Sequence, residues 1–294
     1  MDPIHTPTWT LSDTRAIDLD RPCVVCIVNA TPDSFSDGGQ HNTLDSAMRY
    51  VERAIRDGAD MLDIGGESTR PGAERVGVEE QINRVVPIIE ALRKRGVDLP
   101  ISIDTTLGGV ASAALSAGAD AINDVSAMTE DPEMLPLAAS AGCGVVLMHR
   151  LVAPDRDSFS DQYQDEPVYE DVVSEVGAHL RARAQDAQER GVDPSRIVLD
   201  PGLGFGKSVE DNLRLIRGTH KLAELGYPVM SGLSRKSFVG RIALDRDSDP
   251  SERVRASVGM SVAHLLAGAR IFRVHDVAEH RQALDAAWGT LRYV

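Results

Sequence analysis

The 294-residue chain has few cysteines, an excess of acidic over basic side chains, and no long apolar run. Its 31 lysines and arginines stand against 45 aspartates and glutamates, which gives a formal net charge of −14. Nonspecific binding to nucleic acid or to an anionic membrane needs basic patches, so this balance argues against both partners. No segment has the roughly 20 apolar residues of a membrane span, and the N-terminus lacks the basic-then-apolar pattern of a secretory signal. We therefore expect a cytoplasmic protein in which a site for an anionic substrate gathers its cations locally.

The three cysteines are Cys23, Cys26 and Cys143. The spacing of Cys23 and Cys26 is that of a redox or zinc motif. The pair lies in an apolar run that reads as a strand, however, and residues three apart in a strand point to opposite faces. No second pair completes a zinc site. The sequence therefore predicts buried structural thiols.

Eight short apolar runs recur along the chain, and amphipathic segments of helical period lie between them. The runs are apolar on both faces and rich in β-branched residues, as expected of parallel strands covered on both sides. They span residues 24–30, 61–65, 101–104, 121–125, 145–149, 197–200, 228–232 and 270–275. The clearest helical segments span residues 44–57, 78–95, 169–190 and 253–267. This alternation predicts an α/β fold, a single (β/α)8 TIM barrel over residues 21–294, after an irregular N-terminal extension over residues 1–20.

A polar cluster stands at the end of each apolar run. Since the carboxyl ends of all the strands of a TIM barrel meet at one rim, these clusters predict an active site there. The segment after the fifth run, residues 151–167, is long for such a connection and carries Phe159 and Tyr163. Long loops on the active face are commonly mobile lids, which is the role we expect for this one.

Three hydrogen-bonding side chains, Asp104, Asn123 and Asp200, end three different predicted strands and should converge inside the barrel mouth. Burying them is costly unless a ligand pairs with them, and a carboxylate suits the N–H/NH₂ edge of a pterin or guanine. The alternative is that they cap the helices that follow, since Asp and Asn are good N-caps. Their convergence, together with Met148, favours the ligand. Asp63 and Asp124 fit a structural role better.

A second group of side chains is cationic or hydrogen-bond donating. It comprises Arg70, Arg235, Lys236, Arg273 and His275. Guanidinium groups match phosphate oxygens in a bidentate manner, so this group predicts a phosphorylated substrate. Asn29 and the nearby Asp33 supply oxygen ligands suited to Mg²⁺ beside phosphate. The alternative to phosphate binding, for any single arginine, is a surface salt bridge of little energetic value.

The glycine-rich segment over residues 201–208 invites interpretation as a nucleotide-binding loop. It does not fit the P-loop pattern, because Pro201 stands where the first glycine belongs. It also fails the dinucleotide-binding pattern, because Lys207 replaces the third glycine. We interpret it as a tight turn that presents Phe205 at the rim of the pocket.

Taken together, the clusters closely resemble those of the dihydropteroate synthase family, the sulfonamide targets of folate biosynthesis. The most specific matching segments are residues 29–39, 63–73, 200–207, 234–240 and 273–277. The resemblance implies a homodimeric barrel transferase. Its reaction would join 6-hydroxymethyl-7,8-dihydropterin diphosphate to 4-aminobenzoate, giving 7,8-dihydropteroate and diphosphate.

The resemblance also implies roles for individual residues. The implied pterin ligands are Asp104, Asn123, Met148, Asp200 and Lys236. The implied diphosphate ligands are Asn29, which would also ligate Mg²⁺, Arg70, Arg273 and His275. The implied aminobenzoate contacts are Phe35, Thr69, Pro71, Phe205, Ser234 and Arg235. Asp33, Asp104 and Lys236 would be the catalytic residues, with the two carboxylates stabilising positive charge at the pterin methylene as diphosphate leaves.

The chain also departs from the family. Cys26 and Ala30 replace the usual glycine and valine, and Ala127 replaces a glycine. After His149 the usual turn is absent and several residues are added before Tyr169. One alternative function is therefore a catalytically silent pterin-binding paralogue, although the first two loops and the cationic group are intact. A second is a methyltetrahydrofolate-dependent methyltransferase, which would have no use for the aminobenzoate motifs. A phosphate-binding isomerase or aldolase would want a buried catalytic Lys or Glu, and none stands out.

Overall fold

The computed structural model describes residues 8–30 and 40–292, and eight parallel strands within them form one sheet. The strand order is β8-β7-β6-β5-β4-β3-β10-β9, and a parallel bridge between Leu199 and Val229 joins its two ends. The predicted (β/α)8 barrel is therefore confirmed. The strands are β3 (Cys23–Asn29), β4 (Met61–Gly65), β5 (Ile101–Asp104), β6 (Ala121–Asp124), β7 (Gly144–Met148), β8 (Ile197–Asp200), β9 (Met230–Ser231) and β10 (Ile271–Val274).

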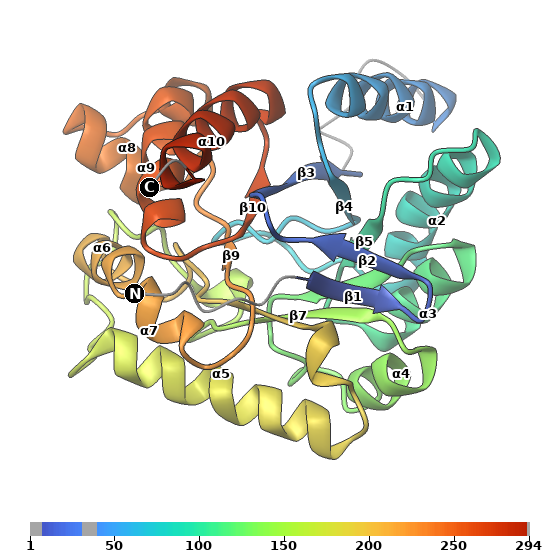
Figure 1. The fold of residues 1–294 in the computed structure, drawn as a ribbon, viewed down its shortest axis with the longest axis horizontal. Helices are drawn as coiled ribbons and strands as arrows, with labels where there is room; N and C mark the ends of the chain where they lie inside the picture. The colour runs from blue at the N-terminus through green and yellow to red at the C-terminus, as the bar shows by residue number, and fades with distance from the viewer. Residues whose placement is uncertain (1–7, 31–39, 293–294) are drawn as a thin grey trace.

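Helices surround these strands on the outside of the barrel (Figure 1). They are α1 (Gln40–Arg56), α2 (Val78–Lys94), α3 (Gly108–Ala117), α4 (Met134–Ala141), α5 (Val172–Glu189), α6 (Val209–Arg217), α7 (Thr219–Ala223), α8 (Ser237–Leu244), α9 (Val254–Leu266) and α10 (Val277–Arg292). Short 3₁₀ helices are η2 (Pro154–Arg156), η3 (Pro194–Arg196) and η4 (Pro250–Arg253).

Three of the predicted strands, 61–65, 101–104 and 197–200, agree with the structure residue for residue. The predicted strand over 228–232 is reduced to β9, Met230–Ser231.

Alternation along the strands separates two apolar clusters. Side chains of one parity pack outward against the helices, among them Cys26 and Val28 on β3. Those of the other parity fill the barrel interior, among them Cys23 and Val25 on the same strand. This confirms that Cys23 and Cys26 lie on opposite faces, and all three cysteines are free and buried.

The N-terminal segment corrects one prediction. Residues 1–20 were expected to be irregular, but β1 (Thr8–Ser12) and β2 (Arg15–Asp18) form an antiparallel hairpin. Trp9 and Leu11 point from it into the barrel interior and are 0% and 1% exposed. The Trp9 indole N–H donates to the carbonyl of Arg196 at 2.9 Å. The segment is polar in composition because one face of the hairpin is exposed to solvent. The other face covers the end of the barrel, and the composition alone did not indicate this.

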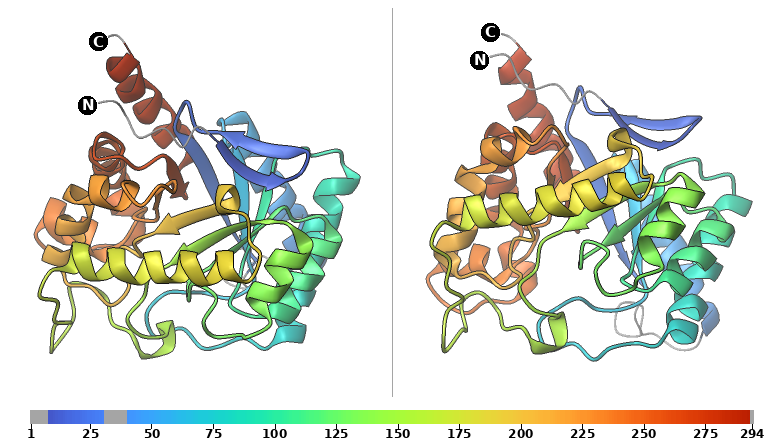
Figure 2. Two further views of the ribbon diagram at one scale, coloured as in Figure 1. Left: turned by 60° about the horizontal axis from the view of Figure 1, so that its bottom comes forward. Right: turned by 90° about the horizontal axis from the view of Figure 1, so that it is seen from below.

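The hairpin lies at the opposite end of the barrel from the loop that follows β7 (Figure 2). Among residues 8–30 and 40–292, no helix is both long enough and apolar enough to cross a membrane.

Candidate active site

The site grows out of the period-two alternation of the strands. Five interior positions near the hairpin are small or apolar apart from one serine: Met61, Ser102, Ala121, Val198 and Ile271. Two residues further along each strand, the interior side chain is charged or amide-bearing. These side chains are Asp63, Asp104, Asn123, Asp200 and Arg273. Residues i and i+2 lie on the same face of a strand. The interior of the barrel therefore changes from apolar to polar over two residues of these strands.

Arg273 holds the centre of this polar layer. Its Nε donates to Asp63 Oδ2 at 2.5 Å, and its Nη2 donates to Asp104 Oδ2 at 2.6 Å. Asp63, which is 1% exposed, also accepts hydrogen bonds from Ser102 Oγ at 2.6 Å and Asn123 Nδ2 at 3.0 Å. One guanidinium thus balances two buried carboxylates, which would otherwise be very costly to bury.

Asp63 is a residue whose importance the sequence reasoning missed. The structural role expected for this strand-end carboxylate places it within the site itself, where it accepts hydrogen bonds from both Arg273 and Asn123. Its parity along β4, two residues after the interior Met61, was the signal that places it inside the barrel. Asp124 has the opposite parity to Asn123, and its Oδ1 accepts from the backbone N–H and hydroxyl of Ser126, both at 2.6 Å, as a structural role requires.

The interior carboxylates are not helix caps. The helices that follow β5 and β6 have Leu107 and Glu133 at their N-caps, and α6 after β8 has Ser208. Asp104 Oδ1 is buried and has no hydrogen-bond partner among the described residues. A buried carboxylate oxygen without a donor is an acceptor held ready for a ligand N–H.

Burial changes the proton affinity of these groups. It raises the pKa of Asp104 to about 7, assisted by Asp63 and opposed by Arg273. It raises the pKa of Asp200 to about 6, against the hydrogen bond from the backbone N–H of Gly202. For Arg273, burial lowers the pKa, but Asp63 and Asp104 outweigh it and the net shift is upward. The arginine is therefore always charged, whereas the two carboxyl groups titrate near neutrality.

Two adjoining cavities lie at the polar layer. The outer cavity, of about 230 Å³, includes Asn29, Ser68, Thr69, Arg70, Pro71, Ser234, Arg235, Lys236, Ser237, Arg273 and His275 in its lining. The inner cavity, of about 20 Å³, includes Asn123, Val125, Met148, Asp200, Phe205, Lys236 and Arg273. Thr69, Gly232, Lys236 and Arg273 line both.

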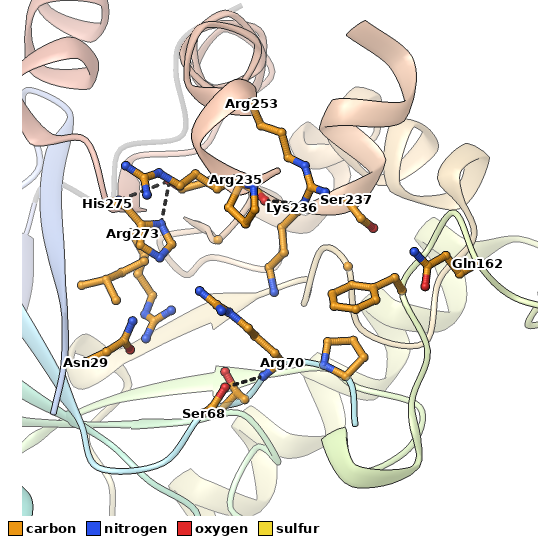
Figure 3. A pocket seen from close by; sticks show the side chains of 18 residues that line it. Asn29, Ser68, Arg70, Gln162, Arg235, Lys236, Ser237, Arg253, Arg273 and His275 are labelled. Carbon is orange, nitrogen blue, oxygen red and sulfur yellow. Dashed lines mark hydrogen bonds between the residues drawn. The ribbon is translucent and has the colours of Figure 1, made fainter. Parts of the chain in front are cut away.

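The outer cavity has two chemically different sides. Figure 3 shows Asn29, Arg273 and His275 together on one side, and Ser237 and Gln162 on the other, with Lys236 and Arg70 between them. The first side belongs to the ends of β3 and β10. The second belongs to the start of α8 and to the loop after β7. Ser237 lines the outer cavity and was not among the predicted site residues, although it belongs to the Ser-Arg-Lys-Ser run that supplied three of them.

Lys236 and Phe205 close the inner cavity. The ammonium of Lys236 lies 3.9 Å from the centre of the Phe205 ring, a cation–π contact. Burial, with Arg273 nearby, lowers the pKa of Lys236 to about 8. Phe205 packs with Val125 and Met148 in a small apolar cluster. It therefore lines the inner cavity with the predicted pterin residues and with Thr69, a predicted aminobenzoate residue that lines both cavities.

His275 and Arg235 are less available than the sequence implies. Burial, with Arg235 and Arg273 nearby, lowers the pKa of His275 to about 3, so the imidazole is neutral and is not a cation. Its Nδ1 lies 3.1 Å from Ser234 Oγ. Arg235, at φ +60°, donates from Nε to Asp276 Oδ2 at 2.9 Å and from Nη2 to Oδ1 at 2.5 Å. This bidentate pair ties the loop after β9 to the end of β10.

The glycine-rich turn after β8 is held by a buried lysine. Lys207 is 0% exposed, and its ammonium donates to the carbonyls of Phe205 at 2.8 Å and Gly202 at 3.0 Å. Gly202 is required here, since its φ is +66° and an added Cβ would lie 1.8 Å from the carbonyl oxygen of His149. The turn is therefore a structural device that fixes Phe205, and no phosphate-binding loop is formed.

The remaining predicted residues fall into two groups. Thr69, Pro71, Arg70 and Asn29 line the outer cavity as the sequence places them. Asp33 and Phe35 lie outside the residues that the structure describes. Arg70 is exposed, and its side chain has no ion pair among the described residues, so it is a cation available at the cavity.

An inner cavity that contains the acceptors Asn123 and Asp200, beside an outer cavity rich in cations, is typical of a barrel enzyme that binds a polar, anionic ligand at the carboxyl ends of its strands. A family model described as pterin binding enzyme matches residues 25–275, and the chain belongs to this family.

Named relatives narrow this class. The chain is 44% identical over 271 residues to the dihydropteroate synthase of Synechocystis sp., covering 91% of each chain. It superposes on Xanthomonas albilineans dihydropteroate synthase with 4-aminobenzoic acid at a TM-score of 0.87 and 44% identity, covering 99% of this chain and 100% of that one. The same enzyme in complex with 7,8-dihydropteroate gives a TM-score of 0.84 at 41% identity, with coverage of 98% and 100%. The function that these similarities show is that of a dihydropteroate synthase, a transferase of folate biosynthesis.

Proposed function

We propose that this site joins a dihydropterin diphosphate to 4-aminobenzoate at the junction of its two cavities, releasing diphosphate. The observation that carries the proposal is that Lys236 and Arg273 line both cavities. A substrate whose ring enters the inner cavity and whose diphosphate remains in the outer one places the bond to be broken beside these two cations.

The inner cavity binds the pterin. Asp200 and Asp104 accept hydrogen bonds from the N–H groups of the ring, Asn123 offers its amide, and Met148 and Phe205 cover the ring faces. A cavity of about 20 Å³ has room for little more than a water molecule. Binding of a bicyclic ring therefore displaces the Lys236 ammonium from Phe205 or the Arg273 guanidinium from Asp104. If Arg273 is the group displaced, it exchanges Asp104 for the diphosphate as its partner.

The diphosphate occupies the side of the outer cavity formed by Asn29, Arg70, Arg273 and His275. The Asn29 side chain has no hydrogen bond to another described residue and lines this side of the cavity, so its amide oxygen would be available to hold Mg²⁺. When bound, Mg²⁺ neutralises charge on the diphosphate leaving group. Neutral His275 contributes a ring N–H donor at this side.

The chemistry needs no protein nucleophile. The C–O bond between the pterin methylene and the diphosphate breaks, the diphosphate takes the electron pair, and the amine nitrogen of 4-aminobenzoate forms the new C–N bond and then loses a proton. Arg70, Arg273 and Lys236 stabilise the leaving charge, while ionised Asp104 stabilises the positive charge that develops on the ring and methylene. Asp33 remains a predicted partner of Asp104.

The arylamine occupies the other side of the outer cavity. Thr69 and Pro71 come from the loop after β4, and Ser237 is the first residue of α8. The backbone N–H groups at a helix N-terminus favour an anion, so the aminobenzoate carboxylate is assigned to Ser237 and this terminus. Arg235 holds the loop after β9 in position by its ion pair with Asp276. Ser234 orients the His275 ring by the contact between its hydroxyl and Nδ1. These two residues and Phe205 thus take roles that differ from the direct arylamine contacts implied by the sequence.

We also propose that the enzyme is a homodimer. Leu266 at the end of α9 and Leu291 near the end of α10 are 57% and 43% exposed, and the two helices pack against each other. Exposed apolar side chains on adjoining helices support an interface there. Sedimentation at micromolar concentration tests it, with a monomer as the contrary result.

Turnover with both substrates and Mg²⁺ tests the proposed reaction. We expect equimolar diphosphate and 7,8-dihydropteroate, and no product without 4-aminobenzoate. Pterin binding with no turnover would instead identify a silent pterin-binding protein.

A further inference from the structure

The loop after β7, residues 151–167, has no part in the function proposed above, yet it is hydrogen-bonded to two other loops of the rim, those after β4 and β8. The carbonyl of Pro154 accepts from the backbone N–H of Gly72 at 2.8 Å, in the loop after β4. On the other side, Asp157 Oδ2 accepts from the backbone N–H of Gly206 at 2.9 Å, in the turn after β8. The loop therefore bridges the two loops that carry Pro71 and Phe205.

Several side chains of this loop are buried and hydrogen-bonded. Asp157 and Ser160 are 8% and 3% exposed. Tyr163 donates its hydroxyl hydrogen to Asp157 Oδ1 at 2.5 Å, and Ser160 Oγ accepts from Asn212 Nδ2 at 3.1 Å. The same Asn212 accepts the backbone N–H of Gly204 at 2.7 Å. These hydrogen bonds link the segment, which its length led us to expect as a lid, to the turn after β8 and to α6.

Phe159 lies between these two anchors and lines the outer cavity, together with Gln162. Gln162 stands on the Ser237 side of the cavity, away from Asn29 and His275 (Figure 3). Among the described residues that line this cavity, Phe159 is the one with a phenyl ring, because Phe205 lies in the inner cavity. The wall of the proposed arylamine side is therefore supplied by the loop that departs most from the family pattern.

We propose that Phe159 is a specificity-determining residue that packs against the benzene ring of the arylamine substrate. The inference rests on the proposed function, since it assigns a contact within its arylamine side. An aromatic wall favours a flat ring, and the anchors at Asp157 and Ser160 hold the side chain in place before the substrate arrives.

Steady-state kinetics on Phe159→Ala test this assignment. We expect the KM for 4-aminobenzoate to rise about tenfold, as loss of one aromatic contact implies, with the KM for the pterin diphosphate within about twofold of wild type. Phe159→Tyr keeps the ring and should restore the wild-type KM. Ser158→Ala, at the exposed neighbouring position, should match wild type in both constants.

Each outcome decides a separate question. Product formation by the wild-type protein tests the proposed reaction without any variant. A wild-type protein that forms no product would overturn the proposed reaction. With wild type active, an unchanged KM for 4-aminobenzoate in Phe159→Ala overturns the assignment. So does an equal rise in both KM values, because that shows general damage to the rim. A ring-specific rise that Phe159→Tyr reverses supports it.

Discussion

The two ends of this barrel are built from the same strands and differ in almost every other respect. At one end, the β1–β2 hairpin seals the interior with Trp9 and Leu11, both buried against apolar side chains. At the other end, two residues further along the strands, Arg273 lies between Asp63 and Asp104 and lines the two cavities. The closed end gains stability from apolar burial, whereas the open end keeps charges that are costly to bury.

This difference teaches that stability and chemistry are separated along the barrel axis. Substitutions at the sealed end should lower stability and leave catalysis intact. Substitutions at the open end should lower catalysis, and they affect stability only where they break the balance of charges.

Trp9→Ala should have the largest effect on stability of any substitution proposed for the sealed end. Loss of a fully buried indole and of its hydrogen bond to Arg196 should lower the free energy of unfolding by about 4 kcal/mol. The remaining folded protein should keep its wild-type kcat/KM. Urea denaturation and steady-state kinetics measure the two effects, with Thr8→Ala, an exposed position on the same strand, as the control. A tenfold loss of kcat/KM in Trp9→Ala would break the separation.

Arg273→Ala should be the exception that affects both properties. It leaves Asp63 and Asp104 buried without their counter-ion, which should cost about 3 kcal/mol of unfolding free energy. It should also lower turnover at least about tenfold by removing a cation from the leaving group. Arg235→Ala, which breaks the more exposed pair with Asp276, should cost about 1 kcal/mol. Wild-type stability in Arg273→Ala would show that the polar layer does not depend on this ion pair.

Asp200→Asn should affect catalysis alone. The amide oxygen can still accept the Gly202 N–H, which the carboxylate receives at 2.7 Å, but it no longer pairs with pterin N–H donors. Turnover should fall at least about tenfold, or about 1.4 kcal/mol of transition-state stabilisation. The free energy of unfolding should not fall. Asp124→Asn removes an equally buried carboxylate of opposite parity on β6 and should keep near-normal turnover. Near-normal turnover in Asp200→Asn would remove Asp200 from the site.

The smallest expected effect is a pH dependence that comes from the same carboxylate. Burial raises the pKa of Asp200 from 3.8 to about 6, so between these values the folded protein holds a proton that the unfolded chain has released. Stability from this group is therefore present at low pH and is lost as pH rises through 6. Relative to Asp200→Asn, wild type should lose on the order of 1 kcal/mol between pH 4 and pH 7, measured by urea denaturation. A constant difference across this range would contradict the raised pKa.

The sequence was sufficient for the barrel and for most of the rim, because parallel strands and their polar ends follow a regular pattern. It was insufficient where a role depends on partners far along the chain. Asp63 became a hub through Arg273, 210 residues away. His275 lost its charge through burial, and Arg235 was occupied by Asp276. The hydrogen bonds that connect the loop after β7 to the rim, such as that between Asp157 and Gly206, join residues 49 positions apart, so the sequence did not predict them.

A crystal structure of this chain with 7,8-dihydropteroate bound tests the central claim most directly. The account predicts the pterin ring in the inner cavity against Asp104, Asn123 and Asp200, and the benzoyl group in the outer cavity between Pro71 and Phe159, with its carboxylate at Ser237. A product bound outside the two cavities, or with its benzoyl group on the Asn29–His275 side, would contradict it.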